Sequence, residues 1–311
     1  MKDILLRPKF IILLLATRPA FLTASAAPVL VGSAAGFAQS GRFDAGIFIL
    51  AFVSIMLIHS GANVANDYFD HISGNDWLNK NPTPFSGGRR FIQQGVLSAK
   101  ATILLSVFLL AAGAALGLAI IWITKSIFIF ILGLAGIVGG FFYTAPPVKL
   151  GYRSLGETAI GFLFGILPVA GAYYLQAKRV DAFVFLPAAI VGILIFLVVF
   201  INEFPDKDAD AAVSKRTLVV NFGMAKSVRI YRLALLSSYA LAIISMFFRI
   251  TFFAGLFYLF TMPLAVAAMK AANEKDLNIP GKVAANRLTI LLHAVGSIAL
   301  TTGFILTGLY K

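Results

Sequence analysis

Long apolar runs, separated by short polar or glycine- and proline-rich breaks, limit what this chain can fold into more than any other feature. Several runs exceed the roughly 18 to 20 residues that a helix needs to cross a bilayer. The composition agrees, because 59% of the residues are hydrophobic and the mean hydropathy is +0.90, far above that of soluble globular proteins. The sequence predicts an all-α, polytopic membrane protein, a single domain over residues 1–311 with nine transmembrane helices around a central cavity. The expected spans lie at about 10–36, 45–66, 101–123, 126–143, 156–177, 182–203, 230–248, 251–270 and 286–308.

The first run, from about 10 to 36, contains Arg18 followed by Pro19. This pair interrupts the apolar core that a cleaved signal peptide requires, and apolar character continues beyond it. We therefore expect an uncleaved first span. Pro19 could place Arg18 near a polar cavity, where it would be one candidate for a substrate contact.

Basic residues are distributed unevenly between the two sides that this nine-span plan defines. With the N-terminus inside, the cytoplasmic segments and the adjoining span edges hold 19 of the 26 Lys and Arg residues, and the outer segments hold six. This is the positive-inside pattern. The net charge of +13 therefore reflects membrane topology, and we expect an integral protein of the cell inner membrane, in contact with membrane lipids and without a nucleic-acid partner.

Two acidic clusters, at 66–70 and 202–210, each close a long apolar run and together hold six of the thirteen acidic residues. Carboxylates at a membrane boundary are costly unless a metal, a cation or a substrate offsets their desolvation. The i,i+4 spacing within each cluster would place oxygen ligands on one face of a helix. The pairs with this spacing are Asn66 and Asp70, Asn202 and Asp206, and Asp206 and Asp210.

The two clusters are related by a constant offset, because Asn66 aligns with Asn202 and Asp70 with Asp206. Each opens a long segment on the cytoplasmic side, at about 67–100 and 204–229, and loops of this length are usually functional or disordered. We expect these cap loops to form short helices over the mouth of the cavity. The two clusters would then face each other as half-sites.

Hard oxygen ligands, in a chain without Cys and with three His that lack ligand spacing, favour Mg²⁺ or Mn²⁺. Two facing clusters could hold Mg²⁺ ions that clamp one diphosphate, and basic residues nearby would neutralise the remaining phosphate oxygens. A diphosphate site inside a helical membrane bundle most simply serves a lipid diphosphate. The expected metal ligands are Asn66, Asp70, Asn202, Asp206 and Asp210; the expected diphosphate ligands are Arg89, Arg90, Lys149, Arg153, Lys215 and Arg216.

The two motifs, the loop at 143–153 and the nine-span plan together resemble the UbiA superfamily of intramembrane aromatic prenyltransferases, over nearly the whole chain. The resemblance implies that the aspartate motifs bind Mg²⁺ and a polyprenyl diphosphate. It also implies that the diphosphate leaves to give an allylic carbocation, which an electron-rich aromatic acceptor captures. On this basis we expect Asp67, Asp76 and Tyr143 to be catalytic, since an aromatic face can stabilise a carbocation.

Within the superfamily, the run 66–70, followed by Gly74-Asn75-Asp76 and by Gly95-Val96-Leu97-Ser98, most resembles 1,4-dihydroxy-2-naphthoate polyprenyltransferases of menaquinone synthesis. The 4-hydroxybenzoate branch usually has an aspartate four residues after the position of Asp70, where this chain has Gly74. The resemblance therefore implies prenylation of the naphthoate with decarboxylation, and 4-hydroxybenzoate or another acceptor is the alternative. This departure leaves the role of Asp76 open.

An ion-coupled transporter is an alternative from another class, because intramembrane acids can form a cation or proton path. Such a path would favour acids near the middle of spans. The acids inside the expected spans, Glu157 and Glu203, both lie at cytoplasmic ends. The clusters also lie among basic residues, which favours an anionic substrate.

Overall fold

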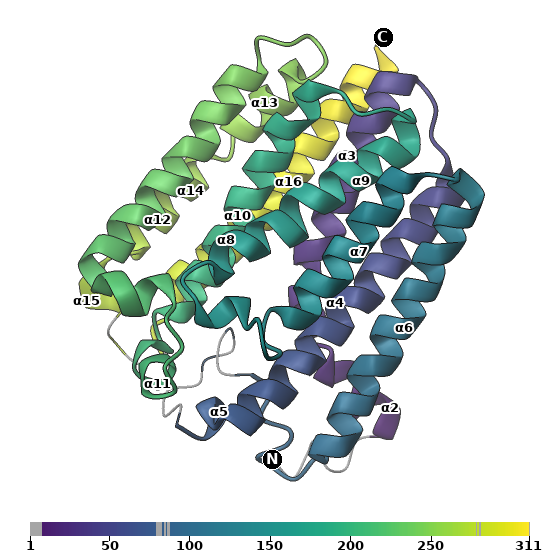
Figure 1. Cartoon of the computed structure of the whole chain (residues 1–311). Coiled ribbons are helices and arrows are strands. Elements are labelled where there is room, and N and C mark those ends of the chain that lie inside the picture. Colours follow the sequence, from purple (N-terminus) through teal and green to yellow (C-terminus); the bar gives the residue numbers. More distant parts are fainter. Residues whose placement is uncertain are drawn as a thin grey trace.

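A computed structural model describes residues 8–78, 83, 85, 88–277, 279 and 281–310. Within these residues every named element is a helix, and Figure 1 shows long helices side by side, with the short helices α2, α5 and α11 toward one end of the bundle. The helices are α2 (Lys9–Ala16), α3 (Thr23–Ser40), α4 (Ala45–Ser73), α5 (Asn75–Leu78), α6 (Ala99–Thr124), α7 (Ile127–Phe142), α8 (Gly156–Ile160), α9 (Leu167–Ala177), α10 (Phe185–Glu203), α11 (Lys207–Ala212), α12 (Leu218–Ser245), α13 (Phe252–Leu259), α14 (Met262–Ala271), α15 (Glu274–Leu277) and α16 (Ala284–Leu309), with 3-10 turns at Pro19–Phe21, Leu150–Tyr152 and Ala182–Val184 and a π-helical turn at Gly161–Ile166.

Six helical segments in the described part of the chain are long and apolar enough to cross a membrane, or up to eight if each of two bent pairs is one span. A further apolar helix, α7, has 16 residues and falls short of that length. The all-α, membrane-spanning prediction is confirmed, whereas the count of nine spans stays a prediction. The six segments are Ala45–Ser73, Ala99–Thr124, Gly156–Ala177, Ala182–Glu203, Leu218–Ser245 and Ala284–Leu309.

The first expected span is broken, with α2 and its 3-10 turn inclined by 58° to α3. Arg18 lies between α2 and the 3-10 turn, in the left-handed backbone region with φ of 55°. Pro19 follows it and opens the 3-10 turn, and the residue before a proline is disfavoured in the right-handed helical region. The charge inside the apolar run therefore lies in the arm that leads into the bend, four residues before Leu22. The span expected at about 251–270 is bent in the same way, by 48° between α13 and α14.

Both expected cap loops are shorter than the sequence predicted. The first acidic cluster lies within α4, which continues to Ser73, and α6 begins at Ala99. Helical structure after the second cluster begins at Leu218, not near 229, because the Thr217 hydroxyl accepts a hydrogen bond of 3.3 Å from the Val220 amide and caps the first turn of α12. Gly223, with φ of 72°, kinks α12 just after that turn. The expected short cap helices are α5 and α11, and residues 79–82, 84, 86 and 87 of the first loop lie outside the described residues.

The largest apolar core surrounds α10, which packs against α3, α9, α12 and α16. The π-helical turn at Gly161–Ile166 lies directly on α10, because a Cβ atom at Gly165 would come within 2.4 Å of the Gly192 Cα atom. Small residues at such crossings let helix backbones approach closely in membranes. This contact fixes the segment that carries Phe164 relative to the helix that carries Asn202 and Glu203.

Candidate active site

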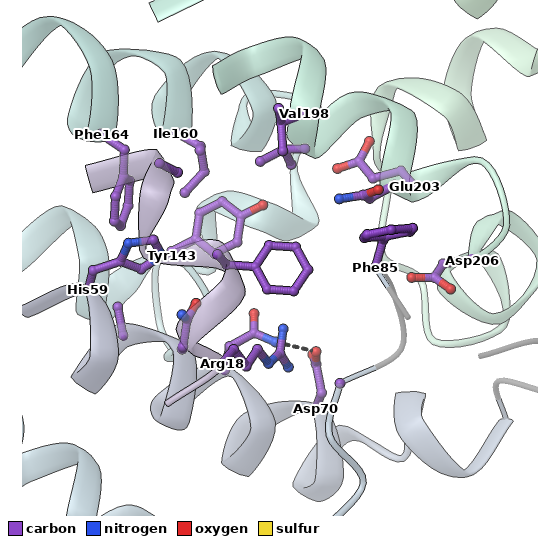
Figure 2. Close-up of a pocket in the computed structure, with 18 of the residues that line it drawn as sticks. Arg18, His59, Asp70, Phe85, Tyr143, Ile160, Phe164, Val198, Glu203 and Asp206 are labelled. Carbon is purple, nitrogen blue, oxygen red and sulfur yellow. Dashed lines mark hydrogen bonds between the residues drawn. The ribbon is translucent and has the colours of Figure 1, made fainter. Parts of the chain in front are cut away.

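A cavity of about 210 Å³ opens where α4, α10, α11 and the bend of the first span meet. Figure 2 shows its two unlike ends, with Glu203 and Asp206 at one and Phe164 and His59 at the other. Lys215 also lines it. Charge is therefore concentrated at one end of the cavity, beside the short helices, while the wall deeper in the bundle is largely apolar.

The first acidic cluster presents Asn66 and Asp70 to this cavity from one face of α4. The Asn66 Nδ2 atom donates a hydrogen bond of 2.6 Å to Asp70 Oδ2, the i,i+4 contact that the spacing predicts. The other carboxylate oxygen, Asp70 Oδ1, is buried and has no hydrogen-bond partner among the described residues. It is an acceptor without a donor at the wall of a polar cavity.

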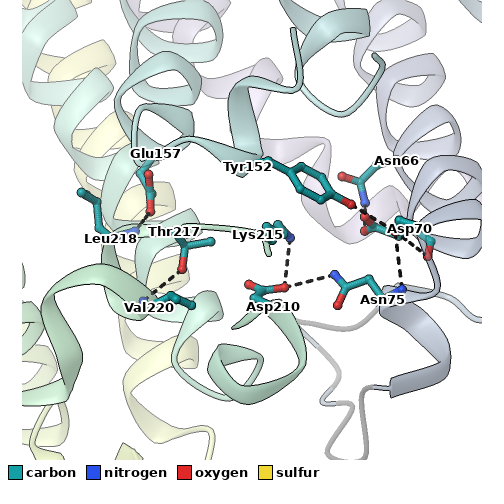
Figure 3. A network of polar contacts seen from close by, with 11 residues as sticks. Asn66, Asp70, Asn75, Tyr152, Glu157, Asp210, Lys215, Thr217, Leu218 and Val220 are labelled. Atoms are coloured by element: carbon teal, nitrogen blue, oxygen red, sulfur yellow. Dashed lines mark hydrogen bonds and ion pairs between the residues drawn. The ribbon is translucent and has the colours of Figure 1, made fainter. Parts of the chain in front are cut away.

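The two clusters meet through Asn75, the first residue of α5 (Figure 3). Its Nδ2 atom donates a hydrogen bond of 3.1 Å to Asp210 Oδ1 on α11, and Lys215 Nζ lies 3.3 Å from the same oxygen. Burial raises the pKa of Asp210, and the nearby Lys215 opposes that shift. Burial alone would lower the pKa of Lys215, but Asp210 and Asp70 outweigh it and hold that pKa well above its ordinary value. The lysine is therefore a fixed positive charge between the clusters.

The second cluster contributes Asn202, Asp206 and Asp210 to the lining. Asn202 Oδ1 accepts a hydrogen bond of 2.8 Å from Asn286 Nδ2 on α16. Asp206 precedes the first turn of α11, and the buried Asp210 has one oxygen, Oδ2, without a hydrogen-bond partner in the described part of the chain. All five residues that the sequence nominated as metal ligands thus line one cavity.

Asp67 points to a different partner from its neighbours. It is buried and forms an ion pair with Arg18, which reaches it from the bend of the first span. Asp67 is not among the residues that line the cavity, whereas Arg18 is. Gly88, with φ of 66°, packs against this pair, and a Cβ atom there would lie 2.8 Å from Asp67 Oδ1. Asp67 therefore holds Arg18 in the cavity wall.

Asp76 is buried in the cavity wall beside α5. Its Oδ2 atom accepts a hydrogen bond of 2.9 Å from Gln93 Nε2, and its backbone carbonyl accepts one of 2.8 Å from Arg90. Burial and the negative charges of Asp70 and Asp67 raise the pKa of Asp76 to about 7. This carboxyl group is thus poised to gain or lose a proton near neutral pH.

Tyr143 lines the cavity and begins the loop at 143–153, and Figure 3 shows Tyr152 of this loop pointing toward Asn66 and Asp70. Tyr152 donates a hydrogen bond of 3.1 Å to the Ser73 hydroxyl at the end of α4. Lys149 Nζ lies 5.0 Å from the centre of the Tyr152 ring, a cation–π contact. The loop is thereby attached to the helix that carries the first cluster.

Lys215 is the one residue among the six expected diphosphate ligands that lines the cavity. Arg89, Arg153 and Arg216 are exposed. The backbones of Arg153 and Arg216 pair as an isolated bridge, which joins the loop after α7 to the segment before α12. Three further residues also line the cavity: Arg18, which the sequence gave as a candidate for a substrate contact, and Asn75 and Glu203, which sequence reasoning did not nominate.

A local signal existed for two of those three positions. Arg18 is a charge within an apolar run, and Glu203 adjoins Asn202 at the end of another run. For Asn75 the sequence offered no signal beyond its position between Gly74 and Asp76. Its partner Asp210 is 135 residues away, so no local pattern reports the contact.

The donor set suits a hard cation that shares ligands with phosphate. Among the described residues, no three carboxylate or imidazole groups converge closely enough to hold a metal ion by themselves. Four residues that line the cavity each have a buried oxygen without a hydrogen-bond partner among the described residues: Asp70 Oδ1, Asn75 Oδ1, Glu203 Oε2 and Asp210 Oδ2. Mg²⁺ is usually held by one or two carboxylates together with substrate phosphates and water, so these residues fit it.

Residues 25–285 match the model of the UbiA prenyltransferase family. The chain is 33% identical over 260 residues to a 1,4-dihydroxy-2-naphthoate octaprenyltransferase of Haemophilus influenzae, covering 82% of each chain. It is 30% identical over 293 residues to the Mycobacterium leprae protein of that name, covering 94% of this chain and 95% of the relative. A solved UbiA homologue from Archaeoglobus fulgidus bound to GPP and Mg²⁺ shares the fold, with a TM-score of 0.58 at 18% identity over 93% of this chain and 99% of that one.

Proposed function

Because the chain belongs to the UbiA prenyltransferase family, we propose that it transfers a polyprenyl group from a polyprenyl diphosphate to 1,4-dihydroxy-2-naphthoate, with loss of CO₂, in menaquinone biosynthesis. The observation that carries the proposal is the Asn75–Asp210 hydrogen bond, which brings two oxygen-rich clusters and Lys215 to the polar end of one cavity. An apolar wall continues from that end. A lipid diphosphate matches this arrangement, because its charged diphosphate suits the polar end and its hydrocarbon chain suits the apolar wall.

In this proposal Asn66, Asp70, Asn202, Asp206 and Asp210 hold Mg²⁺ together with the diphosphate of the donor. When bound, Mg²⁺ supplies Lewis-acid stabilisation of the charge on the leaving group. Lys215 adds a fixed positive charge beside the same oxygens. The other basic residues that the sequence nominated do not line the cavity: Arg89, Arg90, Lys149, Arg153 and Arg216. In this proposal their positive charges attract the anionic substrate to the mouth of the cavity.

The chain's own residues would then prepare the bond exchange. The bond between the allylic carbon and the diphosphate oxygen breaks, and its electron pair leaves with the diphosphate. The face of Tyr143 stabilises the allylic cation, and the apolar wall around Ile160 and Val198 excludes water that would capture it. A ring π electron pair forms the new bond at the carbon that bears the carboxylate. The bond between that carbon and the carboxylate then breaks, and its electron pair returns to the ring as CO₂ leaves.

Arg18 lines the cavity and is not paired with the metal-binding carboxylates. We therefore propose that Arg18 binds an anionic group of one of the substrates and that Asp67 positions it. The Arg18 Nε atom is buried and has no hydrogen-bond partner among the described residues, which leaves a donor for that group. Asp76, whose pKa is about 7, would accept a proton from an acceptor hydroxyl group.

We further propose nine crossings, with α7 and each bent pair counted as one, and an active site that faces the cytoplasm of the inner membrane. The 19-to-6 distribution of basic residues supports this orientation. The transporter alternative does not account for the family match. The alternative acceptor, 4-hydroxybenzoate, is distinguished from the naphthoate by the following experiment.

The test is to incubate the purified full-length protein with Mg²⁺, octaprenyl diphosphate and either 1,4-dihydroxy-2-naphthoate or 4-hydroxybenzoate, and to identify the products by mass. We expect prenylated product with the naphthoate, one CO₂ per diphosphate released, and loss of activity when the metal is chelated. Product that keeps its carboxylate, or turnover with the benzoate alone, would overturn the acceptor and leave the prenyltransferase assignment in place.

A further inference from the structure

Lys215 lies in a short connector, residues 213–217, between α11 and α12. It lines the cavity, although neither helix contains it. Its amide donates a hydrogen bond of 2.8 Å back to the Asp210 carbonyl, which ties it to α11. On the other side, the kink at Gly223 separates the first turn of α12 from the rest of that helix. Contacts with other elements therefore decide where the far end of the connector lies.

The connector pairs with a stretch of chain 62 residues earlier, just before α8. The Arg216 amide donates a hydrogen bond of 3.2 Å to the Tyr152 carbonyl, and the Arg216 carbonyl accepts one of 2.6 Å from the Ser154 amide. The Ser154 hydroxyl donates a further bond of 2.8 Å to the same carbonyl. The residue next to Lys215 is thus held through both its N–H and its C=O group.

The second contact of this region is with Glu157, in the first turn of α8. Glu157 Oε1 accepts a hydrogen bond of 2.6 Å from the N–H of Leu218, the first residue of α12. The first N–H groups of a helix have no intrahelical partner, and the helix dipole makes a carboxylate a favourable acceptor for them. Glu157 is 1% exposed, and it forms no ion pair with any residue that the structure describes. Its carboxylate therefore serves the start of α12.

Glu157 does not line the cavity, whereas Lys215 does. Figure 3 shows Lys215 between the Glu157–Leu218 hydrogen bond and Asp70. Leu218 is three residues after Lys215, so a shift of the first turn of α12 would carry the connector with it. Any effect of Glu157 on the polar end of the cavity must therefore pass through another residue.

We propose that Glu157 is a positioning residue for prenyl transfer, because by binding the Leu218 N–H it fixes the first turn of α12 and holds the Lys215 ammonium group beside the diphosphate. This inference rests on the proposed function, in which Lys215 stabilises the charge of the leaving diphosphate. Such stabilisation depends on preorganised groups, and a misplacement of about 1 Å caused by a distant residue can lower the rate on the order of a hundredfold.

Glu203 offers a different route by which Glu157 could act. It lines the cavity, and its carboxyl group lies next to that of Glu157. An effect through Glu203 would not require Lys215. A double-mutant cycle separates the two routes, because the effects of two residues that act through the same group are not additive.

The experiment compares full-length Glu157→Met, Lys215→Met and the double variant. Glu157→Met removes the acceptor oxygen and keeps a long side chain, and Glu157→Ala takes its place if the first variant does not fold. One readout is kcat/KM for octaprenyl diphosphate with the naphthoate. The other is the Kd of inorganic pyrophosphate with Mg²⁺, measured by calorimetry, which needs no turnover.

Two further variants distinguish positioning from a general loss of stability. Glu157→Gln keeps an acceptor oxygen for the Leu218 N–H. Ser126→Ala is the matched control, because the buried Ser126 hydroxyl accepts a hydrogen bond of 3.3 Å from the Ile129 N–H at the start of α7 and does not line the cavity. It removes a buried helix cap away from Lys215.

We expect Glu157→Met to lower kcat/KM for octaprenyl diphosphate at least about tenfold and to weaken pyrophosphate binding, with the KM for the naphthoate unchanged. Glu157→Gln should recover most of this loss. In the Lys215→Met background, Glu157→Met should change either readout less than about twofold. Ser126→Ala should lower the thermal midpoint and leave kcat/KM unchanged.

A loss of the same size with and without Lys215, or full activity of Glu157→Met, would overturn the positioning role of Glu157 alone. Absence of product from the unaltered protein would instead overturn the proposed function, and the role of Lys215 with it.

Discussion

Asn75 donates a hydrogen bond of 3.1 Å to Asp210, and this contact joins the region after α4 to α11. Both partners line the cavity, and Lys215 lies 3.3 Å from the same Asp210 oxygen. The two acidic clusters are therefore parts of one site, and the uncharged side-chain amide of Asn75 connects them. An amide in this place adds no further negative charge to a cavity that already holds four aspartates and Glu203.

Replacing Asp210 by Asn should lower prenyl-transfer kcat/KM on the order of a hundredfold or more, because it removes a carboxylate from the proposed metal and diphosphate site while keeping a side-chain oxygen. Asp208→Asn is the matched control. Asp208 lies on the same helix and is exposed, and its replacement removes the same charge outside the cavity. Equal activity of the two variants would contradict the ligand assignment.

Breaking the Arg18–Asp67 ion pair should affect stability and activity separately. Arg18→Met leaves a buried carboxylate without its partner and should destabilise the protein by about 3–5 kcal/mol. Adding Asp67→Asn should restore much of that stability, but not the activity, since the guanidinium group is still missing. Thermal unfolding and turnover of the single and double variants check this. If the double variant were no more stable than Arg18→Met, the ion pair would not contribute to the stability of the protein.

Asp76 should make stability depend on pH in the metal-free protein. Its pKa is about 7 when folded and about 3.8 when unfolded, so the folded state binds the proton more tightly. The contribution to stability is full below pH ~4 and is lost as the pH rises to ~7. The thermal midpoint should therefore fall by a few degrees between pH 5 and 7.5 with chelator present, and Asp76→Asn should flatten that dependence. An unchanged slope in the variant would show that other groups cause it.

The proposed orientation can be tested with single cysteines, because the chain has none of its own. Ser214 precedes α12 near the polar clusters, and Ser40 ends α3 on the opposite side of the bundle; both are exposed. In intact cells an impermeant thiol reagent should label Ser40→Cys and leave Ser214→Cys unlabelled. Inverted vesicles should give the reverse result. The opposite pattern would place the site on the outer side.

The sequence predicted those parts of the site that depend on local geometry. Asn66 and Asp70 share a helical face by their spacing, and the same spacing turns Asp67 toward a different neighbour. The start of α12 was missed because the apolar run begins later than the helix does. Its first turn depends on the Thr217 cap, a short-range hydrogen bond that hydropathy does not report.

The contacts that complete the site depend on tertiary structure. The charge before a proline suggested a place near a polar cavity for Arg18 but did not indicate its partner, Asp67, which lies on another helix. Likewise, the basic residues beside the clusters looked alike in the sequence. Lys215 was separated from its exposed neighbours only by the folding of α11 against α5.

The Arg18–Asp67 pair has a consequence for how the chain enters the membrane during synthesis. A lone charge at the centre of a span costs about 2.5–3.5 kcal/mol on insertion scales. Arg18 belongs to the first pair of bent helices and Asp67 to the helix that follows, so the two opposite charges emerge from the ribosome in consecutive segments. They can neutralise each other as a hairpin before any later helix is made. Each of these two consecutive segments therefore brings the counter-ion of the other.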